Sequence, residues 1–336
     1  MFMQYFKNSL IVTALGLVLA LYLGGASALY IVALLAVLEI SLSFDNAVVN
    51  VKVLETMEVK WQKRFITFGI PIAIFGMRFL FPIIIVALAS GMGVVDTFAL
   101  ALHEPESYHS KLMDVEQLIF AFGGSFLLMV FLSFLFDMER EEKWITSIED
   151  SKLVKKMGQI SKIQMVLVIG IGIILFLVTW LGSSFNYEVT VAYFMGVTLY
   201  SLIASLDDLF NVNGVRSGIM GFLYLEMLDA SFSFDGVIGA FSLSSNIFII
   251  MIGLGIGAMF VRSLTLYMLA KKTLTEYRYL EHGAHYAVLA LALIMLVQIF
   301  VHIDEVIVGT VGITFIAVSI YHSIKANNRT IALKVD

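Results

Sequence analysis

The sequence predicts an all-α fold, a polytopic membrane helix bundle of about ten transmembrane helices with an inverted-topology internal repeat. Three observations predict this class. Of the 336 residues, 60% are hydrophobic and 14% are charged, whereas soluble domains carry about 25% charged residues. The basic residues gather between alternate apolar segments. One acidic motif occurs twice, in segments expected to run in opposite directions. We expect residues 1–336 to form a single domain in the lipid bilayer.

Ten apolar segments are long enough to cross a bilayer, which takes about 17 to 25 residues. They lie at about 9–25, 28–50, 65–90, 116–136, 163–182, 189–206, 217–240, 246–270, 284–302 and 305–324. The first also has the features of a signal peptide, with Lys7 before it and Ala26-Ser27-Ala28 after it. We favour a retained helix because the apolar run is long for a signal peptide. The seventh segment is the weakest because it contains three acids.

The basic residues set the orientation of these segments. If the N-terminus is cytoplasmic, 18 of the 21 Lys and Arg residues fall in cytoplasmic segments. Only Lys111 falls outside, and Arg78 and Arg262 lie within spans. The charge distribution therefore predicts that both termini are cytoplasmic.

Two longer connections separate the spans. Residues 137–162 form a charged cytoplasmic loop, expected to be partly helical and available to bind a protein partner. Residues 91–115 form an outer loop that contains His103, Glu104, His109 and Asp114, at spacings that match no strong metal-ligand pattern. We expect both connections to be solvated loops.

The repeat lies in the second and seventh segments. One reads Glu39-Ile-Ser-Leu-Ser-Phe-Asp45-Asn46, and the other reads Asp229-Ala-Ser-Phe-Ser-Phe-Asp235-Gly236. In the next segment of each half, a glycine precedes an arginine by nine positions, Gly69 before Arg78 and Gly253 before Arg262. Because the copies lie in the second and seventh spans, an odd number of steps apart, the second copy is inverted, as in many secondary transporters. The halves cover about 28–136 and 217–302.

Carboxylates in these segments indicate a function. Each charged residue at the bilayer centre costs about 2.5–3.5 kcal/mol on insertion scales, and close helix packing requires only small residues. The predicted metal ligands are the oxygen-bearing residues of both copies: Glu39, Ser43, Asp45, Asn46, Asp229, Ser233 and Asp235. Glu226 is an accessory candidate. Arg78 and Arg262 either balance the charge of the acids or bind an oxyanion.

The spacing of the motif leaves its geometry open. In a regular helix, residues six apart are displaced by about 9 Å along the axis, so Glu39 and Asp45 could not share one small ion. Partial unwinding at the serines would bring these acids together. An intact helix would instead give each acid a different partner.

The ligand chemistry favours a hard divalent cation, Mn²⁺, Ca²⁺ or Mg²⁺, as the substrate ion. The chain has no cysteine, which excludes thiolate metal sites. We expect no organic cofactor and no nucleic-acid partner. No nucleophile and base pair occurs in a plausible context, so we do not expect an enzyme.

The paired motifs, with Arg78 and Arg262, resemble the TerC/Alx family of integral membrane proteins over about residues 28–325. That resemblance implies a Mn²⁺-linked transporter with Asp45 and Asp235 as its characteristic acids. We expect it to export Mn²⁺ across the bacterial inner membrane in exchange for protons, because export against the membrane potential needs coupling. The sequence alone does not set the direction of transport. Gly236 departs from the family pattern, which has Asn. Two alternatives stay open: a non-transporting membrane factor for metallation or stress resistance, and a transporter of tellurite or another oxyanion.

Overall fold

The structure is a computed structural model that describes residues 2–181, 186–210, 218–244 and 246–335. Those ranges contain helices and connections but no strand. The helices are α1 (Phe2–Leu42), α2 (Phe44–Glu55), α3 (Val59–Pro71), η1 (Ile72–Leu80), α4 (Phe81–Ser90), α5 (Val94–His103), α6 (Pro105–Asp114), α7 (Glu116–Leu135), α8 (Thr146–Glu149), α9 (Lys152–Gly158), α10 (Ile163–Leu181), α11 (Tyr187–Phe210), α12 (Gly218–Leu243), α13 (Ile247–Lys271), α14 (Thr273–Glu276), α15 (Leu280–Gln298) and α16 (Glu305–Val335). The predicted all-α membrane bundle is confirmed.

Helices occupy the described parts of all ten expected segments. Within the described residues, seven helices are long and apolar enough to cross a membrane, and the bent pair of α3 with η1 and α4 adds an eighth. α12 is not among them, because it carries the acids of the second motif. With α12 the total is nine described spans. The tenth expected span has no helix of its own, because α1 covers the first expected segment and most of the second.

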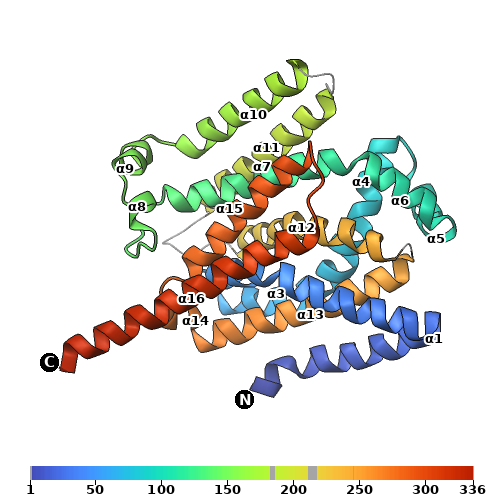
Figure 1. Cartoon of the computed structure of the whole chain (residues 1–336), viewed down its shortest axis with the longest axis horizontal. Coiled ribbons are helices and arrows are strands. Elements are labelled where there is room, and N and C mark those ends of the chain that lie inside the picture. The colour runs from blue at the N-terminus through green and yellow to red at the C-terminus, as the bar shows by residue number, and fades with distance from the viewer. Residues whose placement is uncertain (1, 182–185, 211–217, 245, 336) are drawn as a thin grey trace.

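α1 is a hairpin of two helical arms, because the backbone is non-helical at Gly24 and Gly25, where Gly25 has a φ of 67°. Both arms pack on α13 (Figure 1). The contacts, with the α1 residue first, are Ser9 with Ser263, Gly24 with Ile249, Leu35 with Gly253, and Glu39 with Gly257. Along the first arm, α1 residue numbers rise as those of the contacting α13 residues fall. Along the second arm, both rise together. The two arms are antiparallel, as two separate spans would be.

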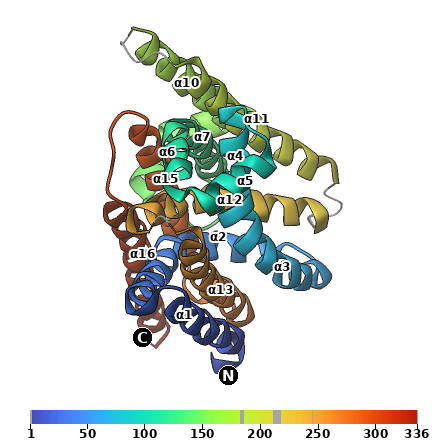
Figure 2. The same cartoon turned by 90° about the vertical axis from the view of Figure 1, so that its right-hand side faces the viewer.

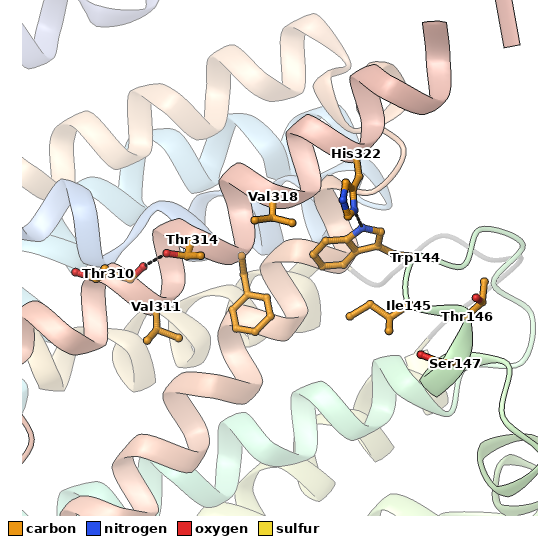
Figure 3. Close-up of a pocket in the computed structure, with 10 residues that line it drawn as sticks. Trp144, Ile145, Thr146, Ser147, Thr310, Val311, Thr314, Val318 and His322 are labelled. Carbon is orange, nitrogen blue, oxygen red and sulfur yellow. Dashed lines mark hydrogen bonds between the residues drawn. The ribbon is translucent and has the colours of Figure 1, made fainter. Parts of the chain in front are cut away.

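The bundle has two distinguishable ends. At one end, Tyr108 of α6 packs on Phe241 of α12, and Gln117 of α7 donates a hydrogen bond to the carbonyl of Ile299. We name this the α5–α6 end. At the other, the loop end, the 137–162 segment meets α15 and α16: the Glu142 carbonyl bonds to the ring of His282, and the Trp144 indole donates a hydrogen bond to His322 (Figure 3). α2 and α12 lie in the middle of the bundle, between the α1 and α13 layer and α7 (Figure 2).

The 137–162 loop is more ordered than expected, because Glu149 anchors it. This side chain is buried and accepts hydrogen bonds from the backbone N–H groups of Trp144 and Ile145, at 3.3 Å and 3.2 Å. It also pairs with Arg140 at 3.1 Å and His282 of α15 at 3.3 Å. Burial opposes ionisation, but the His282 hydrogen bond and charge, together with the backbone donors, lower the pKa of Glu149 to about 2.

The expected outer loop is also helical, since residues 94–114 form α5 and α6. Tyr108 and Leu112 are buried against the bundle. The histidines and acids of this segment do not gather: within the described residues, no group of three His, Asp or Glu side chains could hold a metal ion. The loop therefore caps one end of the bundle.

Candidate functional site

Both motifs remain helical, so the alternative with intact helices describes the structure. α12 is continuous through the second motif. The first motif has a one-residue irregularity at Ser43, with φ of −103° and ψ of 16°, between α1 and α2. Even there the helical hydrogen bonds continue, from Ser43 N–H to the Glu39 carbonyl at 3.0 Å and from Ala47 N–H to the Ser43 carbonyl at 3.2 Å. The acids are thus presented from helix faces.

Glu39 is the first acid of the first motif, and its side chain is almost fully buried, at 1% exposure. Arg78 of η1 forms an ion pair with Glu39 Oε1, and the Ser43 hydroxyl donates to the same oxygen at 2.9 Å. Arg78 also donates to the carbonyl of Ala73 at 2.7 Å. A buried carboxylate is tolerated when it is paired in this way.

Asp229, the corresponding acid of the second motif, has a more complete set of donors. Arg262 of α13 pairs with its Oδ2 at 2.9 Å. The side-chain amides of Asn46 and Asn50 each donate to its Oδ1 at 2.9 Å. Arg262 also donates to the Gly69 carbonyl at 3.1 Å. All three donors to Asp229 are charged or amide groups, so its charge is strongly stabilised.

The two motifs contact each other reciprocally across the bundle. Asn46, the last residue of the first motif, bonds to Asp229, the first acid of the second. In turn Gly236, the last residue of the second motif, faces Glu39, the first acid of the first: a Cβ on Gly236 would lie 3.0 Å from Glu39 Oε2. These exchanged contacts agree with the pseudo-two-fold relation that inverted repeats have.

A small cavity lies between the two ion pairs. It is lined by Asn46, Asn50, Ala73, Arg78, Asp229, Ala258, Val261, Arg262 and Thr265. Its volume of about 10 Å³ is roughly the space for one water molecule. The Oδ1 atoms of Asn46 and Asn50 are buried and have no hydrogen-bond partner among the described residues. Carbonyl oxygens without a donor are available as ligands for a hard cation.

Asp45 occupies a different environment from the paired acids. It is buried and accepts a hydrogen bond from the Asn46 N–H at 2.9 Å. It lines a separate cavity of about 20 Å³ with Phe232 of α12 and Gly312 of α16, among other residues. Of the two geometries that the sequence left open, the structure has the one with an intact helix, in which Glu39 and Asp45 have different surroundings and Asp45 lies away from the ion pairs.

Three predicted site residues of α12 remain, Ser233, Glu226 and Asp235. Ser233 is buried, and its hydroxyl has no hydrogen-bond partner among the described residues. Glu226 is also buried, and in the described part of the chain neither of its carboxylate oxygens has a hydrogen-bond partner. One of them lies 2.9 Å from the Cβ position of Gly69, beside Arg262. The side chain of Asp235 lies outside the described residues.

A family model described as "Protein of unknown function (DUF475)" matches residues 44–330. The chain belongs to this family. No curated protein and no solved structure matches the chain.

The DUF475 match covers Asp45, Arg78, the whole second motif and Arg262, and it begins after Glu39. Most of the site therefore lies in the family region. Asn50 lies in that region too, but it was not among the predicted site residues. The sequence could have indicated Asn50, because a residue four positions after Asn46 lies on the same helix face. Glu149, by contrast, carries no such signal, since its role depends on contact with the distant His282.

Proposed function

We propose that this DUF475 protein is a divalent-cation transporter, with Mn²⁺ the leading candidate ion, exported in exchange for protons. The observation that carries the proposal is the arrangement of two buried carboxylate–arginine pairs, one from each inverted motif, on either side of a small cavity. Glu39 pairs with Arg78 and Asp229 pairs with Arg262. Transporters with inverted repeats bind their substrate at such a repeat interface.

The ligand set supports a hard cation. The site residues offer carboxylate, amide and hydroxyl oxygens, and the chain contains no cysteine. Such ligands suit Mn²⁺, Mg²⁺ and Ca²⁺. The resemblance to the TerC/Alx family favours Mn²⁺ among them. The arginines neutralise the acids in the absence of an ion, and a cation entering the cavity would take over that role.

Export of a divalent ion requires coupling. Moving two charges against an inside-negative potential of 100 mV costs about 4.6 kcal/mol, twice the value for one charge. Protons that bind to the vacated carboxylates would supply this energy as they move inward. The transport cycle we propose therefore exchanges the cation and protons on the same set of acids.

The test is a flux measurement in proteoliposomes, with a Mn²⁺-quenched dye and a pH dye trapped inside. We expect Glu39→Gln and Asp229→Asn, which each remove the acid of one ion pair, to abolish Mn²⁺ flux and the accompanying proton flux. Asp150→Asn, at a half-exposed aspartate of the 137–162 loop, is the matched control and should transport normally. Undiminished flux in both motif variants would overturn the assignment of these acids.

A second candidate is a membrane factor that binds metal without transporting it. The observation that favours it is the solvent exposure of apolar side chains on the anchored 137–162 loop, where Ile148, Leu153 and Ile160 are 44%, 67% and 52% exposed. Apolar side chains exposed on one short segment suit a protein partner. Mn²⁺ binding by the purified protein without any flux in sealed vesicles would support this candidate.

The oxyanion alternative rests on Arg78 and Arg262, which line the same cavity. Guanidinium groups bind oxyanions well. In this structure, however, each arginine is engaged by a carboxylate, and an anion would have to displace that carboxylate. Inhibition of transport by tellurite but not by Mg²⁺ or Ca²⁺ would favour this alternative.

A further inference from the structure

A second cavity approaches Glu39 from the α5–α6 end of the bundle. Its volume is about 270 Å³, and it lies between the second arm of α1, α12 and the beginning of α13. Glu39 and Gly236 line its inner part, and Leu38, Gly239, Leu243 and Asp304 line the rest. Leu243 is the last residue of α12, and Asp304 precedes α16. The cavity thus extends from the end of the bundle to a buried acid.

The outer part of this cavity belongs to the α5–α6 end for two reasons. Asp304 follows Ile299, whose carbonyl is bonded to Gln117 at the beginning of α7. Leu243 follows Phe241, which packs on Tyr108 of α6. The basic residues predict that this end faces away from the cytoplasm. Asp304 is exposed there.

The inner part of the cavity ends at an incompletely covered carboxylate. Among the described residues, Arg78 and Ser43 donate hydrogen bonds to Glu39, and both bonds are to its Oε1 atom. Oε2 faces Gly236, where a side chain would cover it. Arg78 does not line this cavity but lines the small cavity beyond it. The Glu39–Arg78 pair therefore separates the two spaces.

We infer that the 270 Å³ cavity is a hydrated vestibule that carries a divalent cation between the outer surface and Glu39. Asp304 lies at its mouth and attracts the cation, and the Glu39–Arg78 pair closes its inner end. This inference rests on the proposed function, since it describes the outer part of the same transport path. It adds a specific residue, Asp304, and a direction of access that the paired motifs do not define.

A lipid acyl chain is the competing occupant, because leucines form much of the wall. The charges favour the cation. An acyl chain would bring hydrocarbon against Glu39 Oε2, and a carboxylate facing hydrocarbon is costly. A cation gains from an acid at each end of the cavity. A site with charges of one sign and apolar walls concentrates ions of the opposite sign.

Thiol labelling tests the vestibule directly, because the chain has no cysteine. We would place single cysteines at Leu38 and Leu243, which line the cavity, and at Val37, which is 60% exposed on the lipid-facing side of the same arm. Glu106→Cys in α6 and Lys155→Cys in the 137–162 loop serve as outer and cytoplasmic controls. A charged, membrane-impermeant methanethiosulfonate is added from outside to intact cells.

We expect the reagent to label Leu38→Cys, Leu243→Cys and Glu106→Cys but not Val37→Cys or Lys155→Cys, and we expect Mn²⁺ to slow labelling at Leu38→Cys. No labelling at either cavity position, while Glu106→Cys is labelled, overturns the vestibule in favour of an acyl slot. Equal labelling of Val37→Cys also overturns it. Two independent cavity positions keep the test valid if one variant fails to reach the membrane.

Asp304→Asn tests the charge at the mouth. Asn is as good a helix N-cap as Asp, so the variant retains a cap for α16 while removing the charge. For Mn²⁺ presented at the outer face, we expect the apparent KM to rise by about tenfold at low ionic strength and by less at high ionic strength. An unchanged KM at low ionic strength would show that Asp304 does not attract the cation at the mouth of the cavity. Because thiol labelling does not require transport, an incorrect vestibule inference can be distinguished from an incorrect assignment of transport.

Discussion

The two halves of the repeat place an acid beside an arginine in the same way but surround the acid differently. Asp229 receives donors from Arg262, Asn46 and Asn50 on both carboxylate oxygens. Glu39 receives donors from Arg78 and Ser43 on one oxygen only. The difference follows from single positions, because Asn46 and Asn50 of the first half correspond to Gly236 and Ala240 of the second. Asp229 lines only the small cavity of about 10 Å³, whereas Glu39 faces the cavity of about 270 Å³.

The helices that carry the arginines differ as well. Arg262 lies on α13, a continuous α-helix, and its guanidinium stacks 3.6 Å from the centre of the Phe65 ring. Arg78 lies on η1, a π-helix that directly follows Pro71. Proline lacks the N–H that an α-helix needs, and π-helical turns occur often at functional sites. The comparison suggests a firmly held second half and a more adaptable first half.

Loss of an arginine should have the largest effect on stability. Removing one partner of a buried ion pair costs about 3–5 kcal/mol, because the other charge remains buried. Each substitution also loses a hydrogen bond to one backbone carbonyl, of Gly69 or of Ala73. We expect Arg262→Gln to lower the free energy of unfolding more than Arg78→Gln, since Arg262 also loses its stacking on Phe65. Thermal unfolding in detergent measures the difference, with the exposed Lys155→Gln as control. A greater loss for Arg78→Gln would reverse the comparison.

Loss of an amide donor should have an intermediate effect. Asn46→Ala removes one hydrogen bond to the ionised Asp229, and hydrogen bonds to charged groups contribute about 1.5–3 kcal/mol. The same unfolding measurement should show this loss. Ser43→Ala is the matched variant in the other half, because it removes a hydroxyl donor from Glu39. If Asp229 is the more tightly held acid, Asn46→Ala should be the more destabilising of the two.

A methyl group at Gly236 should have the smallest effect on stability and a clear effect on transport. Gly236→Ala gains up to about 1 kcal/mol of helix propensity, offset by crowding at 3.0 Å from Glu39 Oε2. We expect a net change within about 1 kcal/mol and slower Mn²⁺ flux in proteoliposomes. Gly170→Ala on α10, where an added Cβ meets no atom within 4 Å, should be stabilised without a change in flux. Equal flux in the two variants would show that Glu39 Oε2 is not on the path.

Much of this arrangement could be predicted from the sequence. Glu39, Asp229 and the two arginines are each conspicuous because a charged residue in an apolar segment needs a compensating partner. The six-residue spacing also indicated that, in an intact helix, Asp45 would lie apart from Glu39. What could not be predicted depends on contacts between distant segments. The anchoring of Glu149 by His282 is one example, and the covering of Asp229 by Asn46 and Asn50 is another.

The pairing of the acids also has an electrical consequence. A carboxylate bound to a guanidinium carries no net charge, so the two pairs add nothing to the charge that crosses the membrane field when the empty protein changes conformation. A bound divalent ion that displaced the arginines would alter that balance. In the proposed cycle, the membrane potential, worth about 2.3 kcal/mol per charge at 100 mV, would oppose the outward movement of the loaded protein and favour its inward movement with protons bound to the acids. Voltage would therefore drive the proton half of the cycle and oppose the cation half.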